Sequence, residues 1–297
     1  MVTGRAVCLL LLALAAGCAE PGASVRGSAT TPPASTATAT AASQRYEITA
    51  LVRQAGGHRP QLCVGSVADS RPPRCGGPEV VPFDWADVPG EESAAGVTWG
   101  EYRLVGTYDG SSFHLTEPPA APAPRSAEPD PAFPTACPAP AGGWRVTDPE
   151  RRSDTDWTAT ARYARGQRDF AGLWLSWPDG RPREGAVDGP QEAYAVVNVA
   201  FTGGLDRHRR EIAERWGGAL CVTSLPRTHR ELHAIEDDAF AHRDEAATAG
   251  VELVGGSVDE VRNVVELGVL VVDDAARRWF GSRYGDAVEL YGVLRPV

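Results

Sequence analysis

Two long segments built from small residues and proline divide the chain into two stretches that can fold. Residues 19–44 are mainly alanine, serine, threonine, proline and glycine, with Val25 as the only large aliphatic residue. Such a composition buries too little apolar surface to offset the entropy of ordering the backbone. Residues 118–143 contain nine prolines, which favour an extended, fairly stiff conformation. We therefore expect a disordered tether up to residue 44, a linker at 118–143, and folded domains at 45–117 and 144–297.

The first 18 residues have the layout of an export signal. Arg5 precedes an apolar block at residues 6–16, and small residues follow before Cys18. The run Leu14-Ala15-Ala16-Gly17-Cys18 resembles the lipobox of bacterial lipoproteins, in which signal peptidase II cuts before a cysteine that carries diacylglycerol. The resemblance implies a signal peptide at 1–17, a lipid on Cys18 and a place on the outer face of the cytoplasmic membrane.

Two other interpretations of these residues stay open, an ordinary secretory signal and an N-terminal membrane anchor. The apolar block is too short for a spanning helix, which needs about 20 residues.

The composition excludes several functions. All 29 residues counted as Lys+Arg are arginine, in a chain rich in alanine, glycine and proline, which is a usage typical of GC-rich actinobacterial genes. The absence of lysine excludes Schiff-base catalysis, a phosphate-loop lysine and a Ser–Lys dyad. The formal net charge of −10 argues against nucleic acid as a partner, because phosphate binding needs a basic surface.

Four cysteines remain after Cys8 and Cys18 are assigned to the export signal and the lipid. An even set in an exported chain indicates disulfides rather than a metal site, since no C-x-x-C spacing occurs. Four cysteines allow three pairings. We favour Cys63 with Cys75 and Cys137 with Cys221, because each pair then lies within or beside one predicted domain.

The fold class that we expect is α+β. Residues 45–117 combine strand-forming segments with the turn signal Asp109-Gly110, which predicts a small β-barrel of about five strands. An oligonucleotide- or oligosaccharide-binding barrel is one such form. The aromatic residues Trp85, Trp99, Tyr102 and Tyr108 belong either to its core or to a sugar-binding platform, and we favour the core.

Residues 144–297 alternate between helical and strand patterns. From Tyr194 the order is strand, helix, strand, a further helix, then strand, helix, strand, which is similar to a ferredoxin-like α/β sandwich with an added helix. Thr228-x-x-Glu231 is a capping box that predicts a helix start, and Asp274 is expected to cap a later helix. The late segment also resembles the propeptide modules of secreted bacterial serine proteases, in pattern alone.

The residues that most resemble a metal site lie on the predicted helix that follows Thr228. His229 and His233 are four residues apart, with Glu236 and Asp237 after them, so two imidazoles and a carboxylate can reach one ion. No H-E-x-x-H or other established spacing is present, and histidines bordering a core more often pack or face water. We therefore predict a solvated, acidic helix face, with no metal and no other cofactor.

No sequence pattern for nucleophilic or paired-carboxylate catalysis is present. The segment Gly255-Gly256-Ser257-Val258-Asp259 lacks the spacing of a nucleophile elbow, and we interpret it as a turn followed by the helix-start signature Ser257-x-x-Glu260. Adjacent acids such as Asp273-Asp274 do not face each other across a cleft, as glycoside hydrolysis requires. The run Arg207–Arg210 precedes Glu211 and Glu214 at helical spacing, which favours a salt-bridged outer face over an anion site.

These observations favour a lipid-anchored envelope protein with a binding or scaffolding role and no catalysis. Beyond the membrane that holds its lipid, its partners would be envelope proteins or wall polymers. The alternatives are an envelope hydrolase with dispersed acidic residues and a protease-propeptide-like inhibitor or folding helper. The folded part resembles no characterised enzyme family.

The substitution Cys18→Ser tests the lipobox. We expect it to release the protein from membranes or to stop its processing, because serine offers no thiol for the diacylglycerol. Fractionation and immunoblotting of cells that express each form measure this directly. A Cys18→Ser protein that stays in the membrane fraction and is cut normally would show that the lipobox interpretation is wrong.

Overall fold

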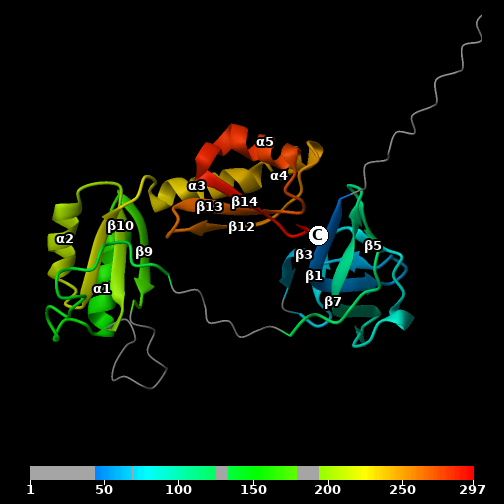
Figure 1. The fold of residues 1–297 in the computed structure, drawn as a ribbon, viewed down its shortest axis with the longest axis horizontal. Helices are drawn as coiled ribbons and strands as arrows, with labels where there is room; N and C mark the ends of the chain where they lie inside the picture. The colour runs from blue at the N-terminus through cyan, green and yellow to red at the C-terminus, as the bar shows by residue number, and fades with distance from the viewer. Residues whose placement is uncertain (1–43, 69, 125–132, 179–193) are drawn as a thin grey trace, which may run out of the picture. The chain divides into compact units, whose positions relative to one another are not determined.

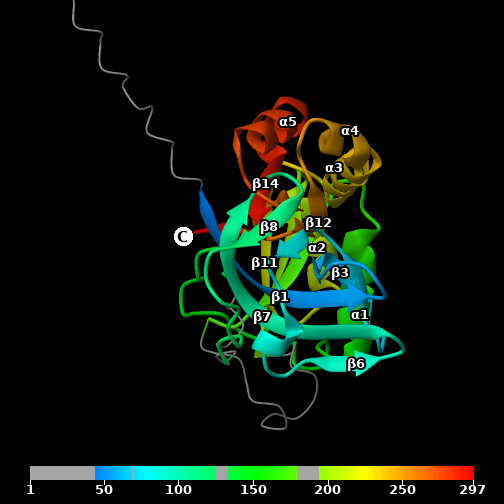
Figure 2. The same cartoon turned by 90° about the vertical axis from the view of Figure 1, so that its right-hand side faces the viewer.

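The structure is a computed structural model of residues 1–297 that describes residues 44–68, 70–124, 133–178 and 194–297. Cys18, the predicted signal peptide and the predicted tether up to residue 43 lie outside the described residues. Residues 43–297 form one compact unit. It contains a β-barrel and two helix–sheet units, and the fold class is α+β as expected (Figures 1 and 2). Among the described residues, no helix is long and apolar enough to cross a membrane.

The barrel consists of two long strands and several short ones from the first folded stretch. Its elements are β1 (Arg45–Ala55), β2 (Gln61–Leu62), β3 (Val64–Ala68), β4 (Arg74–Gly76), β5 (Glu79–Val81), the 3-10 helix η1 (Trp85–Asp87), β6 (Glu92–Ala94), β7 (Val97–Tyr108) and β8 (Ser112–Leu115). Five strands close a ring in the order β1-β2-β5-β8-β7, and β7 pairs again with β1. The predicted small barrel is therefore confirmed, and Cys63 and Cys75 form a disulfide within it.

The turn between β7 and β8 follows from the predicted Asp109-Gly110 signal. The Asp109 carboxylate accepts hydrogen bonds from the backbone N–H groups of Ser111 and Ser112, and Gly110 adopts a positive φ of 99°. The bonds from Ser112, His114 and Ser111 lower the pKa of Asp109. In this hairpin the glycine allows the backbone conformation of the turn, and the ionised aspartate accepts hydrogen bonds from the exposed N–H groups.

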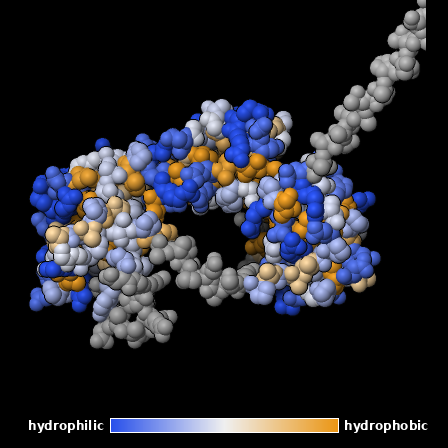
Figure 3. Space-filling model, viewed as in Figure 1, coloured by the Kyte–Doolittle hydropathy of each residue, from blue (hydrophilic) through white to orange (hydrophobic). Residues whose placement is uncertain are grey.

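The first helix–sheet unit follows the linker. It comprises α1 (Asp154–Arg165), β9 (Phe170–Ser176), β10 (Val196–Phe201), α2 (Leu205–Ala213) and β11 (Ala219–Ser224). In its sheet β9 is antiparallel to β10, and β10 is parallel to β11. Apolar residues of both helices, including Ala164 and Ile212, pack on Val197 and Val199 of the central strand. The outer surface of α2 is hydrophilic, as expected for the arginine run (Figure 3).

The second helix–sheet unit runs almost to the C-terminus. It comprises α3 (His229–Ala241), α4 (Arg243–Thr248), β12 (Leu253–Asp259), β13 (Val264–Val269), α5 (Asp274–Tyr284), the 3-10 helix η3 (Gly285–Ala287) and β14 (Val288–Gly292). Here β12 is antiparallel to β13, and β13 is parallel to β14. Leu232 of α3 and Phe280 of α5 are buried against the sheet.

The prediction of a ferredoxin-like sandwich is wrong in one respect, because the expected single sheet is two separate three-stranded sheets. The reason is strand β12. The segment Gly255-Gly256-Ser257, which we interpreted as a turn before a helix, is extended and pairs with β13. With β12 in place, β13 has a hairpin partner of its own and does not pair with the strands of the first unit.

The two units are copies of one arrangement, helix–strand–strand–helix–strand. Residues 196–224 align without a gap to residues 264–292, and the parallel pairing has the same register, since Val197 faces Leu220 as Val265 faces Val288. Both copies also begin with a helix that carries a complete capping box. The identical pairs are Val196 and Val264, Val197 and Val265, Asp206 and Asp274, Arg209 and Arg277, Arg210 and Arg278, Arg215 and Arg283, Gly217 and Gly285, and Ala219 and Ala287.

The second unit completes the core of the barrel. Leu270, just after β13, and Leu294 are 1% exposed and belong to the same apolar cluster as Val52, Leu62 and Leu104 of the barrel. Complete burial of a leucine side chain stabilises a fold by about 1.5–3 kcal/mol. The last strand, β15 (Arg295–Pro296), then pairs antiparallel with β1 and joins the barrel sheet. Figure 1 shows the red C-terminal strand beside the blue first strand.

The end of the linker is bound to the sheet of the first unit. Trp174 donates a hydrogen bond to the carbonyl of Pro134, the N–H of Ala136 donates to the side-chain oxygen of Asn198, and Cys137 forms a disulfide with Cys221. Asn198 is completely buried, and its amide also donates to the carbonyl of Val196. Both predicted disulfide pairings are therefore present.

Candidate functional site

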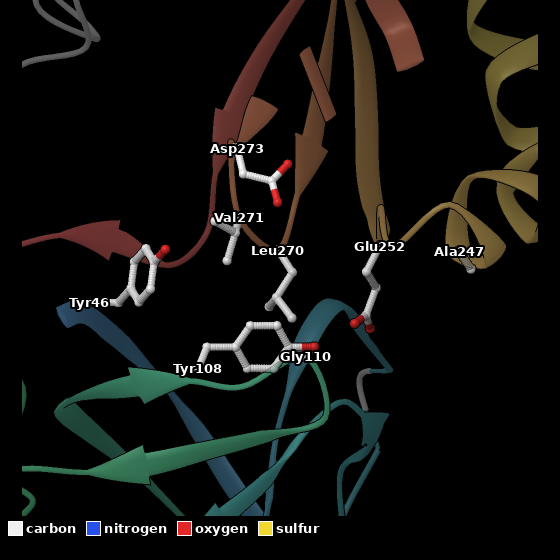
Figure 4. Close-up of a pocket in the computed structure, with 9 residues that line it drawn as sticks. Tyr46, Tyr108, Gly110, Ala247, Glu252, Leu270, Val271 and Asp273 are labelled. Atoms are coloured by element: carbon white, nitrogen blue, oxygen red, sulfur yellow. The ribbon is translucent and has the colours of Figure 1, made fainter. Parts of the chain in front are cut away.

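A cavity of about 490 Å³ lies where the barrel meets the second unit (Figure 4). The barrel contributes Tyr46 from β1, Tyr108 from the end of β7 and the turn residue Gly110. The second unit contributes side chains from the segments that flank its sheet and from α4. These residues are Ala247, Gly250, Glu252, Leu270, Val271 and Asp273. The cavity therefore exists only because the C-terminal part of the chain closes the barrel.

The charged side chains that line this cavity are both acidic. Figure 4 shows the tyrosine rings on the barrel side and the carboxylate of Glu252 directed towards the hydroxyl end of Tyr108, with Asp273 farther away on the side of the second unit. Glu252 is exposed at the mouth, yet the surrounding protein removes enough water from its carboxyl group to raise the pKa. Its carboxylate has no hydrogen bond or ion pair with any residue that the structure describes.

Burial raises the pKa of both tyrosines that line the cavity. For Tyr108 the pKa rises to about 12, with Glu252 and Asp109 adding to the effect of burial. For Tyr46 burial is again the larger cause, and Asp273 adds to it. Both phenols therefore stay protonated at neutral pH, so that the cavity presents neutral hydroxyl groups and ring faces beside two carboxylates.

Asp273 has a second role, as the N-cap of α5. One of its carboxylate oxygens accepts a hydrogen bond from the N–H of Ala276 at 2.8 Å. We expected Asp274 to be the cap, but Asp274 is the first helical residue. This difference matters because the capping hydrogen bond fixes the orientation of the Asp273 carboxylate, which lines the cavity.

A second cavity, of about 700 Å³ on the barrel, also combines an aromatic ring with carboxylates, at Phe83, Asp84, Asp87 and Glu117. Two of its three carboxylates already have partners. Asp84 accepts the N–H of Ala86, and Glu117 forms ion pairs with Arg45 and Arg103. The carboxylate of Asp87 has no hydrogen bond or ion pair with the described residues, so each cavity keeps one unpartnered carboxylate. The cavity at Glu252 differs in that the surrounding protein raises the pKa of its unpartnered carboxyl group.

The structure brings together only part of the candidate set on α3, since Nδ1 of His233 lies 3.0 Å from the Glu236 carboxylate but Asp237 pairs with neither histidine. The Nε2 atoms of His229 and His233 lie 3.2 Å apart, and His229 pairs with Glu260 at 3.0 Å rather than with Asp237, which is exposed. Burial lowers the pKa of His229, although Glu260 opposes this effect. In the described parts of the chain, no group of three or more metal-ligating side chains could hold an ion.

Glu260 connects the two units. Its other carboxylate oxygen accepts a hydrogen bond from the backbone N–H of Leu173 in β9, at 2.7 Å. His229 also lies against Phe170 of that strand, with ring centroids 5.5 Å apart. The cluster that suggested a metal site in the sequence is thus part of the contact between the first and second units.

A buried polar cluster holds the first unit together. His208 is completely buried and stacks on Phe201, while its ring nitrogens lie 2.9 Å from the Tyr163 hydroxyl and from Asp169. The arginines around His208 are exposed, as expected for the run at 207–210, whereas His208 lies on the buried face of α2 together with Ile212. The order Tyr163–His208–Asp169 has the pattern of a catalytic triad. Burial raises the pKa of Tyr163, and the hydrogen bonds of the cluster connect α1 to α2.

The aromatic residues of the barrel belong mainly to its core, as predicted. Trp99 and Tyr102 are buried, and Trp85 and Tyr108 are partly buried against the apolar cluster that includes Tyr102. Of these four, only Tyr108 also lines the cavity at Glu252. Sequence analysis missed this cavity because its residues come from separate elements and form no local pattern.

Comparisons with known proteins add no functional assignment. No family model matches the chain, and no curated protein matches it. The site is therefore argued from its geometry.

The substitution Asp169→Asn tests the buried cluster. Burial raises the pKa of Asp169, but the hydrogen bond with His208 and the charge of Arg207 outweigh it, and the pKa is lowered from 3.8. A lowered pKa in the folded state stabilises the protein above the unfolded value, and this stabilisation is lost as the pH falls through the folded value. We expect Asp169→Asn to lower the free energy of unfolding by about 1–3 kcal/mol at pH 7.

The loss should be constant above about pH 5 and should shrink as the pH falls below 3.8, because protonated aspartate resembles asparagine. Urea unfolding followed by tryptophan fluorescence measures it. Asp206→Asn is the control, since Asp206 is 87% exposed in its pair with Arg209. A difference between wild type and Asp169→Asn that stays unchanged down to pH 2 would contradict this account.

Proposed function

We propose that the protein is a lipid-anchored extracytoplasmic binding protein, held through Cys18 on the outer face of the cytoplasmic membrane. The export layout of residues 1–18 supports the location. The two disulfides agree with an oxidising compartment. The ligand site in this proposal is the cavity between the barrel and the second unit. Envelope proteins or wall polymers are the partners that fit such a location.

The observation that carries the binding role is the carboxylate of Glu252. It lines a cavity, its pKa is raised by burial, and no described residue neutralises it. Glu252 is exposed, but its carboxyl group loses part of its water, and a carboxylate that loses water without gaining a partner is destabilised. An unpartnered carboxylate with a raised pKa beside two aromatic rings is typical of a binding site in which the ligand supplies the missing partner.

The barrel supports the same proposal at the level of fold. Its ring order, with the parallel pair β5 and β8, is consistent with an oligonucleotide- or oligosaccharide-binding barrel. The net charge of −10 opposes nucleic acid. Fold alone does not assign a ligand, so the argument rests on the cavity.

An envelope hydrolase is the second candidate. Glu252 and Asp273 line one cavity, and the raised pKa of Glu252 suits a general acid. Asp273, however, is occupied as the N-cap of α5, which reduces its freedom to act as a base or nucleophile. Binding therefore agrees better with the geometry than hydrolysis does.

The substitution Ala247→Phe tests whether the cavity is a ligand site. Ala247 is an exposed residue of α4 that lines the cavity, so a phenyl ring at this position should occupy the space without disturbing the core. Ligand-detected NMR with a library of cationic, neutral and anionic small molecules measures binding to the wild-type protein. We expect a subset to bind, and Ala247→Phe to weaken that binding at least about tenfold, or about 1.4 kcal/mol.

Ala234→Phe is the matched control, because Ala234 is exposed on α3 and does not line the cavity. It should leave binding unchanged. If no compound binds the wild-type protein, or if the bound compounds are unaffected by Ala247→Phe, the cavity is not the ligand site.

A further inference from the structure

The charge of the cavity limits the class of ligand. Glu252 and Asp273 are its charged lining residues, and Asp109 lies close enough to add to the field at Tyr108. Among the residues that the structure describes, no arginine lines the cavity, and the chain has no lysine. An anionic ligand would therefore meet two or three like charges without a compensating group. A cationic ligand, in contrast, would compensate the negative charge of Glu252.

The aromatic rings distinguish among cations. Tyr46 and Tyr108 present ring faces whose quadrupole attracts a positive charge, and such rings recognise ammonium groups in particular. A divalent metal ion prefers several oxygen ligands instead. Among the described residues, no group of three metal-ligating side chains is available at this cavity or elsewhere. The combination of rings and carboxylates thus favours an organic cation over a metal ion.

The remaining wall is apolar. Leu270, which is 1% exposed, and Val271 belong to the second unit and face the two tyrosines across the cavity, as Figure 4 shows. These side chains suit a short hydrocarbon group, whereas a sugar would require hydrogen-bond partners for each hydroxyl. A volume of about 490 Å³ lies within the usual range for small-molecule sites.

We propose that this cavity binds a small organic cation, an ammonium group on a short apolar body, with the ammonium beside Glu252 and the ring of Tyr108. The inference rests on the proposed binding function and names its ligand class. In the bound state, the ammonium is held by charge and by the ring faces. The hydrocarbon part lies along Leu270 and Val271.

Choline and 3,3-dimethyl-1-butanol are the probes that test this assignment. They have nearly the same shape, but the first carries a trimethylammonium group where the second has a neutral tert-butyl group. Isothermal titration calorimetry of the full detergent-solubilised protein measures both affinities. We expect choline to bind at least about tenfold more tightly than the alcohol, because only the cation interacts with Glu252 and with the ring quadrupoles.

Glu252→Gln removes the charge and keeps the size of the side chain. We expect it to weaken choline binding about tenfold and to leave the binding of the alcohol unchanged. Asp244→Asn is the matched control, because it removes one negative charge from a side chain of α4 that is 97% exposed and does not line the cavity. It should not change either affinity. Thermal unfolding of each variant confirms that it is folded.

The possible outcomes test the ligand class and the binding function separately. Equal affinities for the two probes, or a Glu252→Gln protein that binds choline like the wild type, would overturn the cationic assignment while the cavity remained a binding site. If neither probe binds and the wider library also fails, the proposed function itself is overturned.

Discussion

The burial of Leu270 and Leu294 in the barrel is the interaction on which the rest of the structure depends. A five-stranded ring from residues 45–115 has an open end, and the apolar residues there need a cover. The second helix–sheet unit provides it with two leucines and then adds β15 to the sheet beside β1. Gly65 permits this close approach, because a Cβ at that position would lie 2.5 Å from the carbonyl oxygen of Val254. The barrel is thus completed by residues that lie far along the chain.

The same contact creates the candidate site. Leu270 separates the rings of Tyr46 and Tyr108 from the sheet of the second unit, and the residues on either side of β12 and β13 bring Glu252 and Asp273 to the cavity (Figure 4). The described part of the first unit, which has the same order of elements, shows no cavity lined by acidic residues. Thr202 and Leu205 occupy the positions of Leu270 and Asp273, and the linker end at Cys137 lies on its sheet instead. Two copies of one arrangement therefore have different surroundings and different roles.

Local signals in the sequence predicted much of the fold. The capping box at Thr228 begins a helix, Asp109-Gly110 forms a hairpin turn, and the cysteines pair within or beside their domains. Strand β12 was missed, because two glycines in its centre have weak strand propensity and only the pairing with β13 keeps them extended. Because β12 was missed, we expected one sheet in a single sandwich where the structure has two separate small sheets.

The site could not be predicted, for a related reason. The second unit docks on the barrel and so brings together Tyr46, Tyr108, Glu252 and Asp273. The spacing of these residues in the sequence forms no motif that predicts this contact. The α3 histidines show the opposite case. Their spacing of four residues does bring His229 and His233 together, but Glu260 and Phe170 approach from other elements and make them part of a packing contact.

Hydrogen exchange of the Leu294→Ala protein tests most directly whether the second unit completes the barrel. The amides to follow are those of Leu62 and Val80, which are hydrogen-bonded inside the barrel and lie far from residue 294 in the sequence. Removing a buried leucine side chain costs about 2–5 kcal/mol. The account predicts that both barrel amides lose protection by this amount, together with the amide of Val251 in the second unit. Val297→Ala, at a side chain that is 61% exposed, should change none of them. Barrel amides that keep their full protection while Val251 alone becomes labile would contradict the account.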